Sequence, residues 1–386
     1  MFGKKTYGFL LAAALLLAAG CAKVETIGSF SDMPMTFGTY VPTSGTKAHT
    51  GTFVSGTTLP AGTSFGVFAF YQEGVIYSGN PATWNASTRT PNFMFNLQVS
   101  SDDYSYSPTR YWPANEENTI SFWAYYPYSI YNADNSGTLK FYQSDGTTAY
   151  SASSTGLPVA KYTVSTNPDQ QYDLLFDSFA NKNKTYENCS PTPGTVPLTF
   201  HHALSLVELN VTAANGSLPA NATINITALE LTNVKSEGTC TTPSASIASD
   251  QNPENYWTDV KTPVTITLPS ASSSTKLILM PQALEADTSS GESGHSKIHL
   301  HMVYDIVFPA AHDPNESLSY KDNEVDAYLW REASYTIGGV AGTGTAYGID
   351  RWLPGRKYVY NIEAGLERIE FSEVTEVSWM TEWPTP

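Results

Sequence analysis

Apolar and polar residues alternate with a period of two over much of the chain, which is the pattern of β-strands with one buried face. Every second residue over 93–99 is apolar, so we expect these side chains on one face of a strand. Residues 64–71 and 119–126 are apolar almost throughout, which predicts strands that are buried on both faces. No stretch combines a helical period of apolar residues with helix caps. The pattern therefore predicts an all-β protein.

A polar, proline-rich stretch over 180–197 separates two groups of expected strands. Before this stretch, one further strand is expected over residues 35–41. From residue 196 onward, strands are expected over residues 196–211, 223–231, 264–268, 276–281, 298–308 and 357–362. Because linkers between domains have this composition, we expect two β-sandwich domains, over 35–190 and 191–386. The Gly-rich stretch 338–344 lacks a lysine and precedes no helix, so it predicts a hairpin loop rather than a phosphate-binding loop.

The first residues have the three parts of a secretory signal. Lys4 and Lys5 are followed by the apolar run 9–19, which is shorter than the about 20 residues that span a bilayer. The run ends in Leu17-Ala18-Ala19-Gly20-Cys21, which resembles a bacterial lipobox, where the cysteine is diacylated and becomes the new N-terminus. We therefore expect a lipoprotein signal peptide over 1–20, lipid attachment at Cys21 and a tether over 21–34. The alternative is an ordinary secretory signal with a chance cysteine.

The charge and the cysteine content limit the kinds of partner that the chain can bind. The net charge is −16 and only 15% of the residues are charged, which argues against nucleic acid as a partner because that binding needs clustered Lys and Arg. An acidic chain is also not drawn electrostatically to anionic lipid, so the lipid on Cys21 would hold it at the membrane. Besides Cys21, only Cys189 and Cys240 are present. They could pair or remain thiols, and neither has the spacing of a metal site.

Catalytic motifs are absent from the sequence. There is no Gly-x-Ser-x-Gly elbow, no P-loop and no recognisable pair of carboxylates. His295, His299 and His301 are candidates for a metal site, which would make the chain a metal-dependent hydrolase. No acidic residue lies beside them at ligand spacing, so one face of an ordinary strand is the favoured interpretation. The sequence thus predicts no catalytic residue, metal or cofactor, and a protein that is not an enzyme.

Aromatic residues, 13% of the chain, are dense in the first half. The group comprises Tyr104, Tyr106, Tyr111, Trp112, Tyr125, Tyr126, Tyr128 and Tyr131. If exposed, such rings could stack on sugars and make the protein a glycan-binding surface lipoprotein. We favour the simpler interpretation that most of them pack in a sandwich core.

Several short motifs follow one another in a characteristic order. They are the lipobox, the strand 35–41, Lys47-Ala48, Tyr111-Trp112-Pro113, Phe122-Trp123-Ala124-Tyr125-Tyr126-Pro127, Asp173-Leu174-Leu175-Phe176, Val196-Pro197-Leu198-Thr199-Phe200-His201-His202-Ala203-Leu204-Ser205, Trp352-Leu353-Pro354-Gly355-Arg356-Lys357-Tyr358-Val359-Tyr360 and Glu376-Val377-Ser378-Trp379. Over nearly the whole mature chain, this series resembles the fimbrillin family, the lipoprotein pilins of Bacteroidales. Residues 215–350 match only in their general β character.

The resemblance implies two transthyretin-like β-sandwich domains and export as an outer-membrane lipoprotein precursor that reaches the cell surface. It implies that a trypsin-like surface protease removes the first strand, here 35–41, by cutting between Lys47 and Ala48. The family's usual residue before the cut is arginine. Other fimbrial subunits then assemble with the chain by strand exchange, and residues 369–379 are the candidate donor segment. The expected protein is a fimbrial subunit or adhesin that becomes part of a fimbrium after processing. The alternative is the glycan-binding surface lipoprotein.

Overall fold

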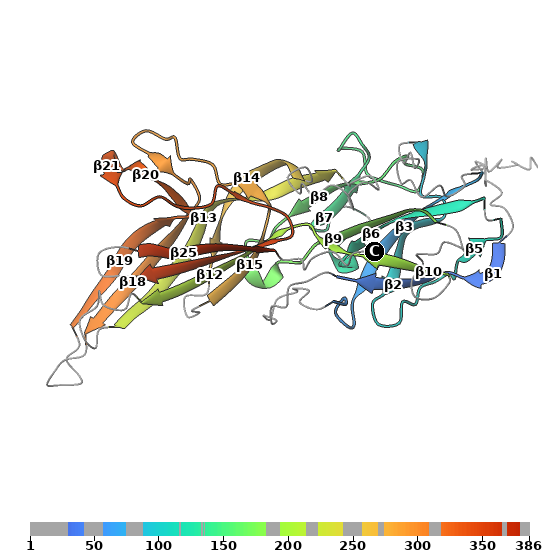
Figure 1. Ribbon diagram of the computed structural model, residues 1–386, viewed down its shortest axis with the longest axis horizontal. Coiled ribbons are helices and arrows are strands. Elements are labelled where there is room, and N and C mark those ends of the chain that lie inside the picture. The colour runs from blue at the N-terminus through green and yellow to red at the C-terminus, as the bar shows by residue number, and fades with distance from the viewer. Residues whose placement is uncertain are drawn as a thin grey trace, which may run out of the picture.

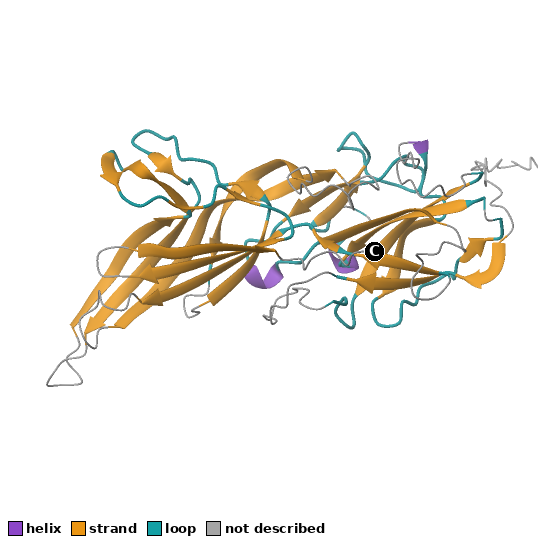
Figure 2. Cartoon of the chain, in the orientation of Figure 1, coloured by secondary structure: helices purple, strands orange, loops and turns teal. Residues whose placement is uncertain are grey.

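The structure is a computed structural model that describes residues 30–41, 57–74, 88–115, 117–132, 134, 136–182, 194–213, 223–241, 257–268, 274–308, 318–364 and 369–378. Within these residues the chain forms strands almost exclusively (Figure 2), and the short 3₁₀ helices η3 (Tyr128–Ile130) and η4 (Pro168–Gln170) lie between them. The prediction of an all-β fold is confirmed.

The first eleven strands lie towards one end of the molecule, and all of them except β7 and β8 build its sheets. They are β1 (Phe30–Pro34), β2 (Thr36–Tyr40), β3 (Ser64–Gln72), β4 (Met94–Ser100), β5 (Tyr111–Pro113), β6 (Thr119–Tyr126), β7 (Leu139–Tyr142), β8 (Val159–Thr163), β9 (Leu175–Lys182), β10 (Thr195–Thr199) and β11 (His201–His202). Five of them form a sheet in the order β11-β9-β6-β3-β4. Two short ribbons, β1-β5 and β10-β2, complete this end.

The other end is built by the later strands. They are β12 (Ser205–Ala213), β13 (Thr223–Thr241), β14 (Trp257–Thr267), β15 (Ser274–Leu279), β16 (Gln282–Ala283), β17 (Ser293–His295), β18 (His299–Phe308), β19 (Leu318–Tyr328), β20 (Trp330–Ile337), β21 (Val340–Thr343), β22 (Tyr347–Gly348), β23 (Arg351–Trp352), β24 (Arg356–Ala364) and β25 (Ile369–Ser378). A four-stranded sheet has the order β15-β12-β24-β25, and a six-stranded sheet has the order β19-β18-β13-β8-β7, with β14 also on β13.

The molecule is elongated, and its two ends follow the order of the sequence (Figure 1). The long strand β13 links them, since its first part pairs with β18 and its last residues pair with β8. The strands β10 and β11, which follow the expected boundary at 190/191, pair with β2 and β9 from before it. The division into two domains at that position stays a prediction. The expected tether over 21–34 ends in strand β1.

The strands β3 and β6 are buried on both faces, as their apolar sequences predict. One face, with Phe65 and Phe122, packs against β2 and β10 in what we call the first core. The opposite face, with Phe68 and Trp123, packs against β7 and β8 and joins a second core that continues between the four-stranded and six-stranded sheets. The five-stranded sheet is therefore a middle layer at its end of the molecule.

The expectation that all apolar side chains over 93–99 share one face is wrong for Phe95. Phe93 and Val99 are in the first core, but Phe95 lies 5.4 Å from Phe68 on the opposite face. The register of β3 and β4 shifts between Val67 and Ala69, and Asn96 has a φ of 46°. A β-bulge with a left-handed residue turns the alternation over at this point.

Candidate functional site: the first strand and its groove

The segment Met35–Val41 packs into the first core. We call the site that it occupies the groove. Met35, Phe37 and Val41 are buried, with exposed fractions of 1%, 3% and 0%. The Phe37 ring makes edge-to-face contacts with Phe65 and Phe122, at centroid distances of 6.0 and 6.2 Å. Burying a side chain of this size stabilises a fold by about 1.5–3 kcal/mol. The apolar face of this short segment is therefore a substantial part of the first core.

Hydrogen bonds hold the segment along both edges. On one edge, residues 36–40 pair in parallel with residues 195–199 of β10. On the other edge, the amide of Met35 donates to the carbonyl of Arg110 at 2.8 Å, and the amide of Val41 donates to the carbonyl of Thr57 at 3.0 Å. Removing the segment would leave an unpaired strand edge next to an open apolar channel, which is a template for another strand.

Two tyrosines fasten the segment from the side. The Tyr106 hydroxyl donates to the carbonyl of Met35 at 2.7 Å, and the Tyr104 hydroxyl lies 3.1 Å from Thr39 Oγ1. Burial raises the pKa of Tyr106 and outweighs the lowering effect of Arg110, so its hydroxyl keeps the proton that it donates. Neither contact was predicted from the sequence. No local pattern could reveal them, because the partners are separated by 71 and 65 residues.

The motif Tyr111-Trp112-Pro113 forms β5 and closes one end of the groove. It pairs with β1, and the Trp112 indole N–H donates to the carbonyl of Gly194 at 2.7 Å. Gly194 has a φ of 91°, a conformation that favours glycine, and precedes β10 directly. One tryptophan thus connects the beginning of β10 with the strand that receives β1.

The predicted processing and lipid sites lie outside the described residues. Cys21 precedes residue 30, and Lys47 and Ala48 fall between residues 41 and 57. These three residues stay predictions. Cys189 is also outside the described residues, while Cys240 is buried and its burial raises the pKa of its thiol to about 12.

The donor candidate 369–379 lies in the structure as β25, up to Ser378. It pairs antiparallel with β24 from Ala364 opposite Ile369 to Arg356 opposite Ser378. β25 is the last strand in the order of the four-stranded sheet. In this structure the segment therefore completes its own sheet rather than extending away from it.

The three candidate metal-binding histidines have other partners. His295 is buried on β17 with Nε2 at 2.9 Å from Glu292 Oε2, and His301 Nδ1 lies 2.8 Å from Asp326 Oδ1. His299 Nε2 lies 3.0 Å from the Thr232 hydroxyl. Within the described parts of the chain, no three His, Cys, Asp or Glu side chains converge in a geometry that could hold a metal ion. The geometry gives the hydrolase alternative no support.

Most of the aromatic residues of the first half pack inside, as expected. Trp112, Tyr125 and Tyr126 are buried, and Tyr104 and Tyr106 contact the first core. Tyr111 is 41% exposed. Tyr128 and Tyr131 are partly buried against the second core, so most of this group is used in packing.

The comparisons with known proteins agree with this architecture. The family model for fimbrillin-like proteins matches residues 46–379. The chain belongs to the fimbrillin-like family. No functionally curated protein matches the sequence. Among the described residues, no helix is long and apolar enough to cross a membrane.

One fimbrial protein of known structure shares the fold, and two further solved structures are similar at lower TM-scores. A fimbrial protein from Bacteroides vulgatus is 19% identical with a TM-score of 0.55, over 89% of this chain and 99% of that one. A candidate cell adhesion protein from Bacteroides uniformis is 17% identical with a TM-score of 0.45, over 90% and 100% of the two chains. The tip fimbrial protein Mfa3 from Porphyromonas gingivalis, truncated at its C-terminus, is 12% identical with a TM-score of 0.34, over 82% and 94%. The family match over residues 46–379 supports a fimbrial subunit or adhesin that is exposed at the cell surface, and the family suggests assembly with other fimbrial subunits.

Proposed function

We propose that this fimbrillin-like protein is exported as a lipoprotein precursor and is assembled by protease-triggered strand exchange. Cys21 would carry the lipid that tethers the precursor to the outer membrane. A trypsin-like surface protease would cut between Lys47 and Ala48, and the strand of another subunit would then replace the released segment. The observation that carries this proposal is the burial of Met35, Phe37 and Val41 in a groove that is bonded along both edges.

The position of Lys47 suits this role. It follows Val41 closely, in a stretch rich in Gly, Ser and Thr, so a cut there would free the whole buried segment. The intact precursor keeps its groove filled, which explains why it would stay monomeric during export. After the cut, the parallel edge of β10 and the apolar channel would be open to a strand of matching alternation.

The donor in this proposal is the C-terminal segment that begins at Ile369. It already has strand conformation as β25, and it lies at a sheet edge, so the strand pairing that has to be released is the one with β24. Releasing it breaks one ladder of hydrogen bonds, and docking in a neighbour's groove forms another. The net gain would then come from the apolar side chains that the groove buries.

The test is limited trypsin digestion of the purified, unlipidated precursor, followed by N-terminal sequencing, gel filtration and electron microscopy. We expect a new N-terminus at Ala48 and oligomers that resist mild denaturant. Lys47→Gln should prevent both changes. Lys261→Gln is the matched control, because Lys261 is 55% exposed on β14, far along the chain from the groove strand. Deletion from Ile369 onward should leave the cut intact and prevent assembly.

Two results would contradict the proposal. The first is an intact Lys47–Ala48 bond under conditions that cut other loops. The second is a precursor that is cut at Lys47 but remains monomeric at high concentration, since an emptied groove without a new strand is not a stable end state.

A further inference from the structure

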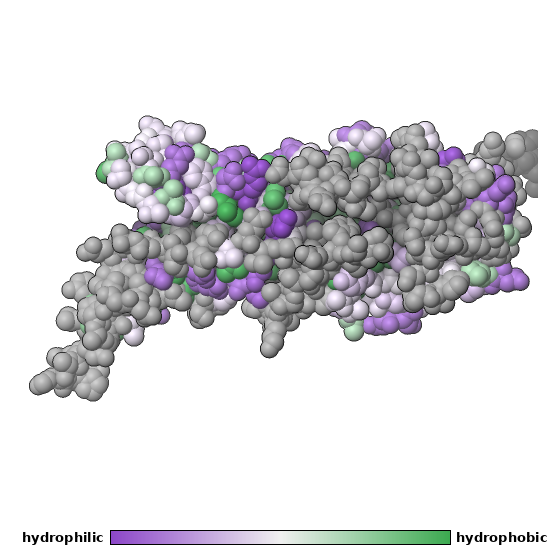
Figure 3. Space-filling model, in the orientation of Figure 1, coloured by the Kyte–Doolittle hydropathy of each residue, from purple (hydrophilic) through white to green (hydrophobic). Residues whose placement is uncertain are grey.

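A small lobe projects from the end of the molecule opposite the first strand. β20, β21 and β22 form it together with β17, and it stands apart from the main sheets at the upper left of Figure 1. β20 and β21 are joined by Gly338-Gly339, whose φ values of 57° and 79° are those of a tight hairpin turn. The predicted hairpin loop over 338–344 is thus a turn followed by strand β21. In Figure 3 most of the lobe is pale, the colour of residues of intermediate hydropathy.

One face of the lobe carries an arginine between two tyrosine rings. Arg331 Cζ lies 4.2 Å from the ring centroid of Tyr335 and 5.1 Å from that of Tyr347. Arg331 and Tyr347 are opposite each other in β20 and β22, and Tyr335 is opposite Gly342 in β21. A Cβ atom at Gly342 would come within 2.4 Å of the Tyr335 ring, so a glycine is needed for the ring to lie against this strand.

The guanidinium of Arg331 is not neutralised by a carboxylate. It has no hydrogen bond or ion pair to any residue that the structure describes, and its buried Nε has no hydrogen-bond partner. Glu332 is the other charged residue between Trp330 and Ile349, and it faces the opposite side of β20 because neighbours in a strand alternate. Burial raises the pKa of Tyr347 to about 12, against the lowering effect of Arg331, so this phenol is neutral at physiological pH. The stack therefore keeps one positive charge in a chain of net charge −16.

The lobe is held in a fixed orientation. The amide of Gly338 donates to Glu292 Oε1 at 2.7 Å, and the amide of Gly339 donates to the carbonyl of Gly291 at 2.9 Å. The indole N–H of Trp330 donates to the carbonyl of Leu284 at 2.6 Å. These contacts fix both ends of β20, so a ligand would not have to order the stack when it binds.

We propose that Tyr335, Arg331 and Tyr347 form a binding site for a carboxylate-bearing saccharide, such as a sialic or uronic acid residue. The planar guanidinium can donate two parallel hydrogen bonds to the carboxylate. Tyr335 and Tyr347, both partly exposed, flank it, and the parts of their rings that Arg331 leaves uncovered can contact the C–H groups of a sugar ring.

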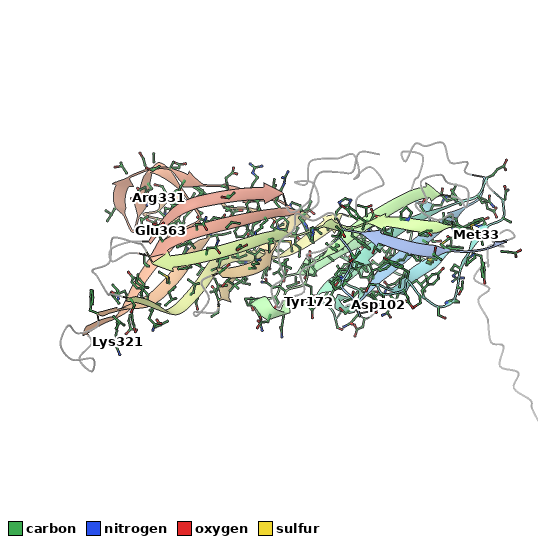
Figure 4. All side chains as sticks on the ribbon, turned by 60° about the horizontal axis from the view of Figure 1, so that its bottom comes forward. Met33, Asp102, Tyr172, Lys321, Arg331 and Glu363 are labelled. Carbon is green, nitrogen blue, oxygen red and sulfur yellow. The ribbon has the colours of Figure 1, made fainter. Side chains whose placement is uncertain are left out.

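This site is independent of the proposed strand exchange. Figure 4 shows Arg331 in the lobe, at the end of the molecule opposite to Met33 beside the groove. A ligand at Arg331 would leave the groove accessible, so one subunit could both assemble and adhere. A saccharide at Arg331 would give the fimbrial subunit a ligand, bound by residues other than the packed aromatics of the first half.

Saturation-transfer NMR titrations of the soluble chain from residue 22 onward test this site. The probes are N-acetylneuraminic acid, its methyl ester, galacturonic acid, galactose and acetate. We expect one or both acids to bind, and the ester, galactose and acetate to bind at least about tenfold more weakly, because each lacks the carboxylate or the ring. Arg331→Gln should weaken acid binding by at least about tenfold. Arg351→Gln is the matched control, since that arginine is exposed and paired with Asp350.

Three results with the sugar acids would overturn the assignment. They are the absence of binding by both acids at millimolar concentration, equal binding of the acid and its methyl ester, and unchanged acid binding by a folded Arg331→Gln variant. Acetate that binds as tightly as the sugar acids would also overturn the assignment, because the site would then recognise a carboxylate without a sugar ring. The ester comparison needs no variant, so it stands even if Arg331→Gln does not fold. Trypsin-triggered assembly is read separately and does not depend on these outcomes.

Discussion

The hydroxyl of Tyr106 and the carbonyl of Met35 are joined by a hydrogen bond of 2.7 Å, although 71 residues separate them in the sequence. This bond connects the segment after β4 to the strand that the proposed protease would release. It is a contact that exists only while the first strand is in its groove, so its loss is a direct measure of how firmly the strand is held.

Tyr106→Phe should loosen the first strand. The variant removes the donor from the Met35 carbonyl, and we expect the free energy of unfolding to fall by about 1–3 kcal/mol. The amides of residues 35–41 should exchange with deuterium faster than in the wild type, which mass spectrometry can follow. Tyr111→Phe is the control, because that ring is 41% exposed and its substitution should change neither measurement. Equal exchange in both variants would show that the Tyr106 bond does not hold the strand.

Phe37→Ala should destabilise the precursor by about 3–5 kcal/mol, because it empties a buried site ringed by Phe65, Tyr106 and Phe122. Chemical unfolding of the unlipidated precursor measures the loss. Thr36→Ala, one position earlier on the exposed side of β2, should cost about 1 kcal/mol or less. A similar loss in both variants would mean that the apolar face of the strand does not contribute as the burial indicates.

Cys21→Ala should abolish lipid attachment, because acylation needs the thiol. Two or three acyl chains give stable membrane retention, whereas a single chain does not. Metabolic labelling with a palmitate analogue and fractionation of membranes measure the effect. Retention of the variant in the membrane fraction after a salt wash would refute the assignment of the lipobox.

Glu208→Gln should lower stability near neutral pH and have a smaller effect in acid. Burial would raise the pKa of Glu208, but Lys357, at 2.8 Å, and Lys276 outweigh it and keep the pKa below its ordinary 4.5. A folded pKa below the unfolded value gives stability that is present above about pH 4.5 and is lost as the pH falls through the folded pKa. Urea unfolding between pH 7 and pH 3 should therefore show a difference of about 1–2 kcal/mol that shrinks below pH 4.5. Glu285→Gln, at a carboxylate that is 55% exposed, should show no such trend.

His202→Ala should be among the more damaging substitutions outside the groove. His202 Nδ1 lies 3.0 Å from Asp173 Oδ1, and both side chains are fully buried. Removing one partner of a buried pair costs about 3–5 kcal/mol, because the other is left in a low-dielectric interior. His301→Ala removes a similar pair with Asp326, but those side chains are 30% and 44% exposed, so its effect should be about 1 kcal/mol or less. Thermal unfolding of the two variants measures the loss of stability in each. Equal losses would contradict the expectation that the buried pair contributes more than the exposed pair.

The sequence by itself determined the local character of the chain. Alternating and continuous apolar residues predicted the strands of the middle layer. This was possible because the burial of a strand's faces is visible in the order of its own apolar and polar residues. The order of short motifs predicted the family, and the fimbrillin-like match confirms it. The face of Phe95 was predicted wrongly, because a bulge at Asn96 reverses the alternation and no residue pattern marks it.

Only the tertiary structure decided which distant segments meet. The parallel pairing of β2 with β10 joins residues 36–40 to residues 195–199, and a strand's own sequence carries no information about its partner. The position of Arg331 between Tyr335 and Tyr347 likewise depends on the turn at Gly338-Gly339 and on the pairing of β20 with β21 and β22. The residues of a segment determine what that segment can bury or bind. Strand pairing and packing across the whole chain determine which segments lie side by side.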